Sequence, residues 1–252
     1  MLTLSDTIPD RRAIVSKRRL VAELQSLAEQ HGTGAALRPH TLAALRKALD
    51  DGRAEVRRRL EAGGTGTDCV RQNAYLMDQV IRALAEHTAG IIFPVANPTS
   101  GEHFAIVAIG GYGRGEMAPF SDVDLLFLTP WKITGWAESV VESMLYMLWD
   151  LKLKVGQSTR TIDDCIRLGG GDITIRTSLL EHRLVCGHAA TAETLRDRLW
   201  SDLFDNSVPE FIEAKLAERA ERHRRQGGQR YVLEPNVKEG KGGLRDLQTL
   251  YW

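Results

Sequence analysis

Apolar residues recur at helical spacing through the first third of the chain. Spacings of three and four residues place such side chains on one face of a helix. The predicted helices cover residues 10–29, 41–60 and 68–87. The second is interrupted only at Asp51-Gly52. We therefore predict a helical N-terminal segment over residues 1–95.

The pattern changes to short apolar runs after residues 94–101, a segment whose two prolines, asparagine and serine mark a junction. Two continuous apolar runs, and a third in which lysines alternate, predict strands; a longer run at helical spacing predicts a helix. The predicted strands are 104–109, 123–128 and 151–155, and the helix is 136–149. Strand, turn, strand, helix and strand form a compact mixed-sheet unit, so we predict a core over residues 96–168.

Helical spacing returns in the last third of the chain. The predicted helices are 161–167, 173–184, 191–203 and 208–225, followed by one that begins near Leu244. We expect residues 169–252 to form a helical segment that packs on the core. The fold class of the whole is α+β.

Composition narrows the possible partners. The 252 residues include 33 basic and 33 acidic ones, so the net charge is zero. A nucleic-acid-binding domain is usually clearly basic, so we expect no nucleic acid as a partner. Three scattered cysteines without a secretory leader predict a cytoplasmic setting, and no apolar run is long enough to predict contact with a membrane.

The candidate chemistry lies between the first two predicted strands. A glycine-rich turn, Gly110-Gly111-Tyr112-Gly113-Arg114, follows the first strand, and Ser121-Asp122-Val123-Asp124 opens the second. Glycines let a backbone approach phosphates closely. Carboxylates at i and i+2 of a strand project from one face, about 6.6 Å apart. This combination predicts metal-assisted phosphoryl or nucleotidyl transfer.

Asp122 and Asp124 are the predicted metal ligands. Mg²⁺, or Mn²⁺ in its place, takes hard oxygen ligands, and a carboxylate pair completed by substrate phosphates supplies them. The alternative is a turn aspartate and a strand aspartate that hydrogen-bond the backbone. The glycine turn in front of them favours the metal site.

The remaining residues of this stretch are predicted to contact the nucleotide. Backbone amides at Gly110 and Gly111 would face its phosphates, and Ser121 would donate its hydroxyl to a phosphate oxygen. Arg114 could neutralise phosphate charge or pair with Glu116 as part of the scaffold, and the sequence leaves both open.

Two other phosphate-binding motifs are excluded. A dinucleotide-binding turn needs Gly-x-Gly-x-x-Gly and then a helix, whereas a Pro-Phe-Ser-Asp segment and a strand follow here. A P-loop needs Gly-Lys-Ser or Gly-Lys-Thr, which the chain lacks.

This stretch resembles the signature of the DNA polymerase β-like nucleotidyltransferase superfamily: paired glycines, a spacer, then Ser-Asp-x-Asp. With Glu116 and Pro119 it resembles more closely the protein-PII uridylyltransferase/uridylyl-removing family, as do Leu148–Thr161 and Glu234–Gln248. The resemblance runs from about residue 104 to the end. It implies a polymerase β-like nucleotidyltransferase core, a small mixed sheet with helices, flanked by helical segments.

The resemblance also implies a third catalytic carboxylate on a later strand, which helps to bind metal and accepts the proton of the nucleophile. Asp150, entering the predicted strand 151–155, is the best placed candidate. It could equally cap the preceding helix or pair with Lys152. Asp163 and Asp164 are the second choice for this carboxylate, although their position is typical of the first turn of a helix.

Further nucleotide contacts are predicted after that strand and near the end. Ser158 and Arg160 belong to a stretch of small, hydroxyl and basic residues that suits a triphosphate or a base. The family often has histidine where Gln157 stands, which puts a role for an imidazole there in doubt. Lys238 and Lys241 lie in a segment that resembles a family loop and could cover the nucleotide, or could be a basic turn before a helix.

The resemblance implies a Mg²⁺-dependent transfer of UMP from UTP to a tyrosine hydroxyl of a PII signal protein. It also implies a histidine-aspartate hydrolase domain and ACT domains beyond this stretch, so we expect the chain to be truncated before them and to remove no UMP. Two alternatives stay open. One is an adenylyltransferase acting on a protein or small molecule. The other is a fragment that binds nucleotide or PII with little turnover.

Overall fold

The computed structural model describes residues 8–205, 207–225, 234 and 236–252. The chain forms two compact units. The first comprises Met1–Asp163 and Glu181–Thr194, and the second comprises Asp164–Leu180 and Leu195–Trp252. The predicted N-terminal helices and the predicted sheet therefore share one unit, while the boundaries predicted at residues 95 and 168 stay predictions.

Four helices open the first unit. They are α1 (Arg11–Ile14), α2 (Lys17–His31), α3 (Leu37–Glu61) and α4 (Gly66–His87). The helix predicted over 10–29 is two helices, because Val15 between them is extended. The interruption predicted at Asp51-Gly52 does not occur. A β-carbon at Gly52 would come within 2.4 Å of Leu76, so this glycine lets α3 pack closely against α4.

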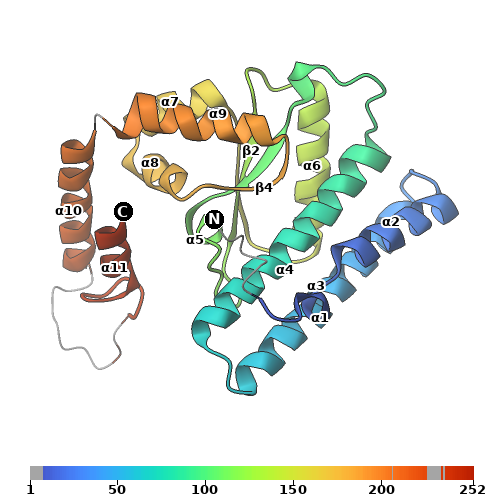
Figure 1. Ribbon diagram of the computed structural model, residues 1–252, viewed down its shortest axis with the longest axis horizontal. Helices are drawn as coiled ribbons and strands as arrows, with labels where there is room; N and C mark the ends of the chain where they lie inside the picture. The colour runs from blue at the N-terminus through green and yellow to red at the C-terminus, as the bar shows by residue number, and fades with distance from the viewer. Residues whose placement is uncertain (1–7, 206, 226–233, 235) are drawn as a thin grey trace. The chain divides into compact units, whose positions relative to one another are not determined.

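A four-stranded mixed sheet follows, in the order β3-β2-β1-β4. Its strands are β1 (Ala105–Ala108), β2 (Val123–Thr129), β3 (Val155–Thr161) and β4 (Arg183–Gly187). β1 is antiparallel to both of its neighbours, and β2 is parallel to β3. The turn α5 (Gly110–Gly113) joins β1 to β2, and α6 (Gly135–Asp150) makes the crossover to β3, as Figure 1 shows. Two short helices, η2 (Thr88–Ile92) and η3 (Ser100–Glu102), lie between α4 and β1.

One predicted strand and the end of one predicted helix were wrong. The third strand begins at Val155 instead of Leu151, because the amides of Leu151 and Lys152 still bond carbonyls of α6, and Lys152 has a φ of +61°. The end of the helix predicted over 173–184 is instead the start of β4, whose residues pair with β1.

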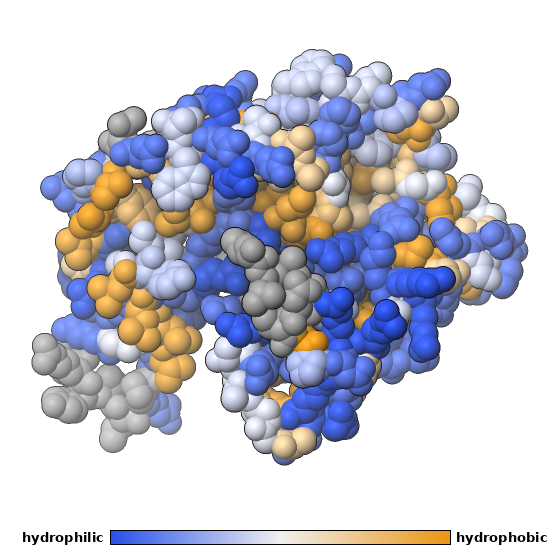
Figure 2. All heavy atoms as spheres, in the orientation of Figure 1, coloured by the Kyte–Doolittle hydropathy of each residue, from blue (hydrophilic) through white to orange (hydrophobic). Residues whose placement is uncertain are grey.

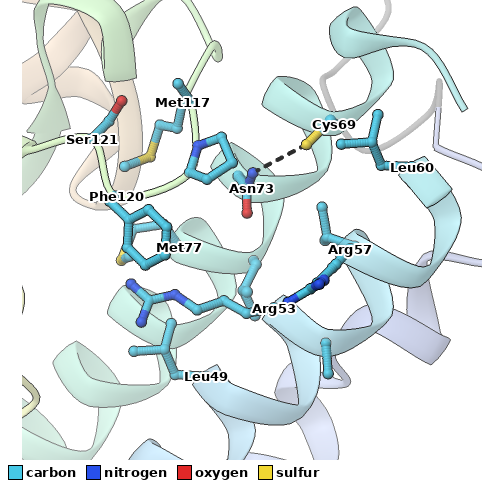
Figure 3. A pocket seen from close by; sticks show the side chains of 15 residues that line it. Leu49, Arg53, Arg57, Leu60, Cys69, Asn73, Met77, Met117, Phe120 and Ser121 are labelled. Carbon is cyan, nitrogen blue, oxygen red and sulfur yellow. Dashed lines mark hydrogen bonds between the residues drawn. The ribbon is translucent and has the colours of Figure 1, made fainter.

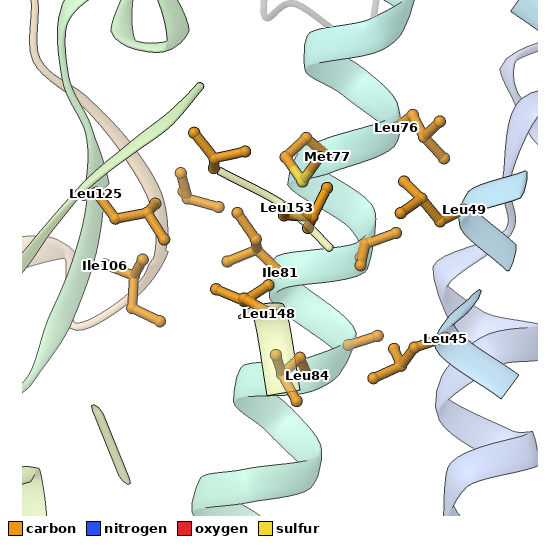
Figure 4. Packing of buried hydrophobic residues seen from close by; sticks show 14 of the residues in the cluster. Leu45, Leu49, Leu76, Met77, Ile81, Leu84, Ile106, Leu125, Leu148 and Leu153 are labelled. Carbon is orange, nitrogen blue, oxygen red and sulfur yellow. The ribbon is translucent and has the colours of Figure 1, made fainter. Parts of the chain in front are cut away.

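One hydrophobic core joins the helices to the sheet. Ile106 of β1 and Leu125 of β2 project toward Ile81 of α4 and Leu148 of α6, and α3 adds Leu45 from the far side of α4 (Figure 4). All of these side chains are buried. Burying a side chain of this kind contributes about 1.5–3 kcal/mol. The sheet is thereby held rigidly on one face, which fixes the ends of its strands.

The second unit is helical. It contains most of α7 (Ile162–Gly171), then α8 (Ile173–Leu180), the end of α9 (Ala189–Leu199), η4 (Trp200–Phe204), α10 (Val208–Arg225) and α11 (Leu244–Tyr251). The buried Arg176 donates to the carbonyls of Gly169 and Gly170, at 2.8 and 2.9 Å, and so ties α8 to the end of α7.

Hydrophilic side chains predominate on the face drawn in Figure 2, with apolar ones in separate patches. Among the described helices, none is long and apolar enough to cross a membrane.

Candidate active site

The glycine turn sits between two strands that are already fixed by the core. Gly110 has a φ of +59°, a left-handed conformation that favours glycine. The amide of Ile109 donates to the carbonyl of Asp124 at 3.1 Å, so the turn is bonded directly to β2. A β-carbon at Gly113 would lie only 1.6 Å from the carbonyl oxygen of Glu181. Glycine at 113 is therefore required by close backbone packing.

Asp124 is half-buried on β2 and lies between two glycines. It pairs with Gly156 in the parallel register of β2 and β3, so the two residues face the same side of the sheet. A β-carbon at Gly156 would come within 2.2 Å of Asp124 Oδ1, and one at Gly110 would stand 3.7 Å from Oδ2. Glycine is therefore required at 156, whereas a β-carbon at 110 would be in ordinary contact with this carboxylate.

Asp122 lies in the loop just before β2 and is exposed. The amide of Ser121 bonds the carbonyl of Ala118 at 3.0 Å, and the amide of Val123 bonds that of Lys154 at 2.8 Å. Asp122 is thus held between two anchored residues. Ser121 is exposed beside it.

These residues fit a divalent cation that substrate phosphates help to hold. Asp122 and Asp124 offer hard carboxylate oxygens, and Mg²⁺ is often bound by one or two carboxylates plus phosphates instead of a complete protein cage. No group of three or more histidine, cysteine, aspartate or glutamate side chains is placed to hold a metal in the described part of the chain. Glycine at 156 lets the Asp124 carboxylate keep its position on β2, because a β-carbon there would collide with it.

Arg114 forms the scaffold pair that the sequence left open. Its Nε lies 3.3 Å from Glu116 Oε2, and its Nη1 lies 2.5 Å from Glu181 Oε2. Two carboxylates thus face one guanidinium, and the arginine ties the glycine turn to the segment just before β4. Glu181 was missed by sequence reasoning, because only the fold brings it to the turn.

A second network, centred on the buried Asp78, also supports the glycine turn. Sequence reasoning missed this network as well. Asp78 of α4 accepts a hydrogen bond from the Tyr112 hydroxyl at 2.8 Å. It also forms an ion pair with Arg183, whose Nη1 lies 2.7 Å away. Arg183 also donates to the carbonyls of Tyr112 and Gly113. Burial, and then the charge of Asp78, raises the pKa of Tyr112 well above 10. This tyrosine is therefore a neutral donor that locks helix, turn and β4 together.

Asp150 is not on a strand. It is the last residue of α6, where its Oδ2 accepts from Arg38 of α3 at 2.7 Å and its carbonyl accepts from Arg46. The carboxylate joins two helices, and this position gives no support to a catalytic role. The fallback residues Asp163 and Asp164 lie in the first turn of α7, where the sequence placed them.

Ser158 and Arg160 lie within β3, where they pair with Leu126 and Leu128 of β2. The expectation that they follow a strand was wrong. They share the face of Asp124 and Gly156, but each step of two residues carries them about 6.6 Å further along the strand. Gly156, at the beginning of β3, is the residue that the structure brings to Asp124.

Lys238 and Lys241 belong to the second unit and precede α11. Lys241 lines a cavity of about 580 Å³ with Arg219, His223 and Asp246. Burial raises the pKa of Asp246, but hydrogen bonds from the Gly242 amide and from the side chains of Arg222 and His223 outweigh it and hold the pKa at about 2.

Comparison with known families agrees with this geometry. Residues 100–184 match the family model described as a nucleotidyltransferase domain. That range includes the glycine turn, β2, α6 and β3. A small mixed sheet in which a glycine turn meets a strand aspartate is thus part of a nucleotidyltransferase domain.

The family can be stated more closely. Residues 210–252 match the family model described as GlnD PII-uridylyltransferase. The chain is 60% identical over 97% of its length to a bifunctional uridylyltransferase/uridylyl-removing enzyme of Azospirillum brasilense, of which it covers 26%. Its identity to the enzyme of that name from Rhodospirillum rubrum is 53% over 96% of the chain and 26% of the relative. The chain therefore belongs to this family, and it spans about a quarter of the length of these relatives.

Proposed function

We propose that the chain transfers UMP from UTP to a tyrosine hydroxyl of a PII protein and releases pyrophosphate, with Mg²⁺ or Mn²⁺ bound at Asp122 and Asp124. The observation that carries this proposal is the placement of Asp124 between Gly110 and Gly156. Family membership supports the choice of uridylyl transfer among the reactions that such a site could perform.

The residues of the chain have separate roles in this proposal. Asp122 and Asp124 bind the cation, which would neutralise charge on the α-phosphate and on the leaving pyrophosphate. The turn at Gly110 and Gly111 offers its backbone to the phosphates, and Ser121 offers a hydroxyl donor. The tyrosine oxygen forms a bond to the α-phosphorus as the bond to the pyrophosphate oxygen breaks, and the phenolic proton passes to solvent water.

Arg114 has a positioning role. Its pairs with Glu116 and Glu181 neutralise it locally, so it fixes the turn more than it supplies charge to a phosphate. Arg183 and Tyr112 support the same turn through Asp78.

Transfer is tested by incubating the chain with a PII protein, UTP radiolabelled in its α-phosphate and Mg²⁺, and following label on the protein. The matched control is a PII variant whose acceptor tyrosine is phenylalanine. We expect labelled protein and pyrophosphate in equal amounts with the natural acceptor, and neither with the variant. Labelling of both proteins would contradict the tyrosine assignment.

Nucleotide choice is tested by thermal stabilisation, because a ligand that binds only the folded protein raises its apparent stability. UTP with Mg²⁺ should stabilise the chain more than ATP with Mg²⁺. Equal stabilisation would favour an adenylyltransferase. Strong stabilisation by UTP without transfer would indicate a nucleotide-binding fragment with little turnover.

A further inference from the structure

A largely apolar pocket of about 430 Å³ opens beside the loop that leads to Asp122. One wall is formed by α3 and α4, and the other by residues 117–121, which connect the glycine turn to β2. Ser121, the residue before Asp122, is part of the lining (Figure 3). Whatever fills this pocket therefore contacts the residue that immediately precedes Asp122.

The lining combines apolar side chains with positive charge. Its apolar members include Leu49, Leu76, Met77, Met117 and Pro119. Arg53 and Arg57 project from α3 into the same space. Arg57 pairs with Glu61 at 2.7 Å, whereas Arg53 has no hydrogen-bond or ion-pair partner within the described chain. The pocket thus offers an apolar interior and one uncompensated cation.

Phe120 forms the outer edge of the pocket and is 85% exposed. Its φ of +65° lies in the left-handed region, which an aromatic residue adopts only under local constraint. Leu60, on the same pocket, is 39% exposed. Exposed apolar side chains around a pocket are typical of surfaces that bury them against a protein partner, where aromatic residues contribute most.

We propose that this pocket docks the acceptor protein, by receiving an apolar side chain that lies close to the acceptor hydroxyl while a carboxylate of the same protein pairs with Arg53. This inference rests on the proposed function, since it assigns a position to the second substrate of the transfer. Phe120 is the residue that the partner covers.

The chemistry favours a protein loop over the nucleotide as the occupant. A triphosphate needs several cations or a row of amides, whereas the pocket is mostly apolar with one free cation among its lining residues. The acceptor has to reach the α-phosphate from beside the metal ligands, and residues 117–121 adjoin both the pocket and Asp122. Docking here holds the acceptor hydroxyl near the α-phosphate. The energy of binding the acceptor then serves to orient the hydroxyl for transfer.

Three variants test the proposal. Phe120→Asn removes the ring while keeping a residue that tolerates the left-handed backbone. Arg53→Glu reverses the unpaired charge. Ala54→Trp fills the pocket from an exposed position on α3. The matched controls are Trp131→Ala, which removes another exposed aromatic ring of the first unit, and Arg18→Glu, which reverses an exposed arginine on α2.

Two measurements are made on each variant: the KM for unmodified PII protein in the transfer assay, and thermal stabilisation by UTP with Mg²⁺. We expect each pocket variant to raise the KM for PII at least about tenfold, the order of loss when a residue that carries much of the binding energy is removed, with UTP stabilisation unchanged. Both controls should keep the KM of the unaltered chain. A KM for PII within about twofold of that value in all three pocket variants would overturn the proposal.

Direct binding of PII to the chain, measured by calorimetry, separates this proposal from the proposed function. If the unaltered chain transfers no UMP, the proposed function fails. Docking then stands only if PII binds and the pocket variants weaken that binding. Equal binding to the variants, or no binding to the unaltered chain, overturns the docking site.

Discussion

Gly156 and Asp124 face each other across β2 and β3 so closely that a single added methyl group would touch the carboxylate. The distance from a β-carbon at Gly156 to Asp124 Oδ1 would be 2.2 Å. Real β-carbons do not approach an oxygen this closely, so the carboxylate would have to turn away. The obstructed atom ends a side chain, so the strands can stay in place.

Gly156→Ala is therefore expected to lower kcat for transfer by about 10²-fold, the order of loss that a displacement of about 1 Å can cause. Its melting temperature should stay close to that of the unaltered chain. The control is Gly135→Ala at the start of α6, where an added β-carbon meets no atom within 4 Å. If Gly156→Ala has full activity, the position of the Asp124 carboxylate does not matter for transfer.

Asp122→Asn and Asp124→Asn test the metal site itself. Each keeps the shape of the side chain and removes a charge from the predicted ligand pair. We expect transfer to fall by at least about 10²-fold in each, and the extra thermal stabilisation that Mg²⁺ adds to UTP to disappear. Glu142→Gln on α6, an exposed carboxylate of the same unit, serves as the control. A folded Asp124→Asn protein with near-normal turnover would remove the basis of the site assignment.

The network around Asp78 predicts two different losses of stability. Asp78→Ala leaves Arg183 partly buried without its carboxylate, which should lower the free energy of unfolding by about 3–5 kcal/mol. Tyr112→Phe removes one hydrogen bond but leaves the ion pair at 2.7 Å intact, so about 1–2 kcal/mol is expected. Urea unfolding of both variants measures the difference. A larger loss for Tyr112→Phe would show that the hydroxyl, and not the ion pair, holds the turn.

The elements that periodicity predicts well are those with a strong local pattern. The helix predicted over 68–87 is α4, at Gly66–His87, and the strand predicted over 123–128 is β2, at Val123–Thr129. Both bury many apolar side chains that recur at the expected spacing. The sequence did not predict β4, because Leu184 continues the apolar spacing of α8. The segment becomes a strand through its pairing with β1.

The residues of the candidate site also differ in how well the sequence predicts them. The turn from Gly110 and the pair Asp122 and Asp124 could be found because they are adjacent in sequence. Gly156, Glu181 and Asp78 could not, since each reaches the site through a strand register or an ion pair between distant segments. Asp150 was misplaced because the helix before it continues to its position, so that the strand begins later than its apolar residues indicate.

His87, at the end of α4, predicts how stability depends on pH. It is buried, its Nε2 lies 3.3 Å from Thr41 Oγ1, and its Nδ1 has no hydrogen-bond partner in the described part of the chain. Burial lowers its pKa below 6.5. The small cavity that it lines also includes Glu86, whose carboxylate is paired with Lys17 at 2.7 Å.

A lowered pKa means that the unfolded chain takes up a proton below pH 6.5 that the folded chain resists. The stabilisation is therefore fully present above the unfolded pKa and is lost as pH falls through the folded one. The free energy of unfolding should decrease as pH falls from about 7 to about 5, with this histidine contributing at most about 1.4 kcal/mol per pH unit. His87→Gln, which stays neutral and retains a polar group near Thr41, should be less sensitive to pH over that range in urea unfolding. Identical slopes for the two proteins would show that His87 is protonated as readily in the folded chain as in the unfolded one.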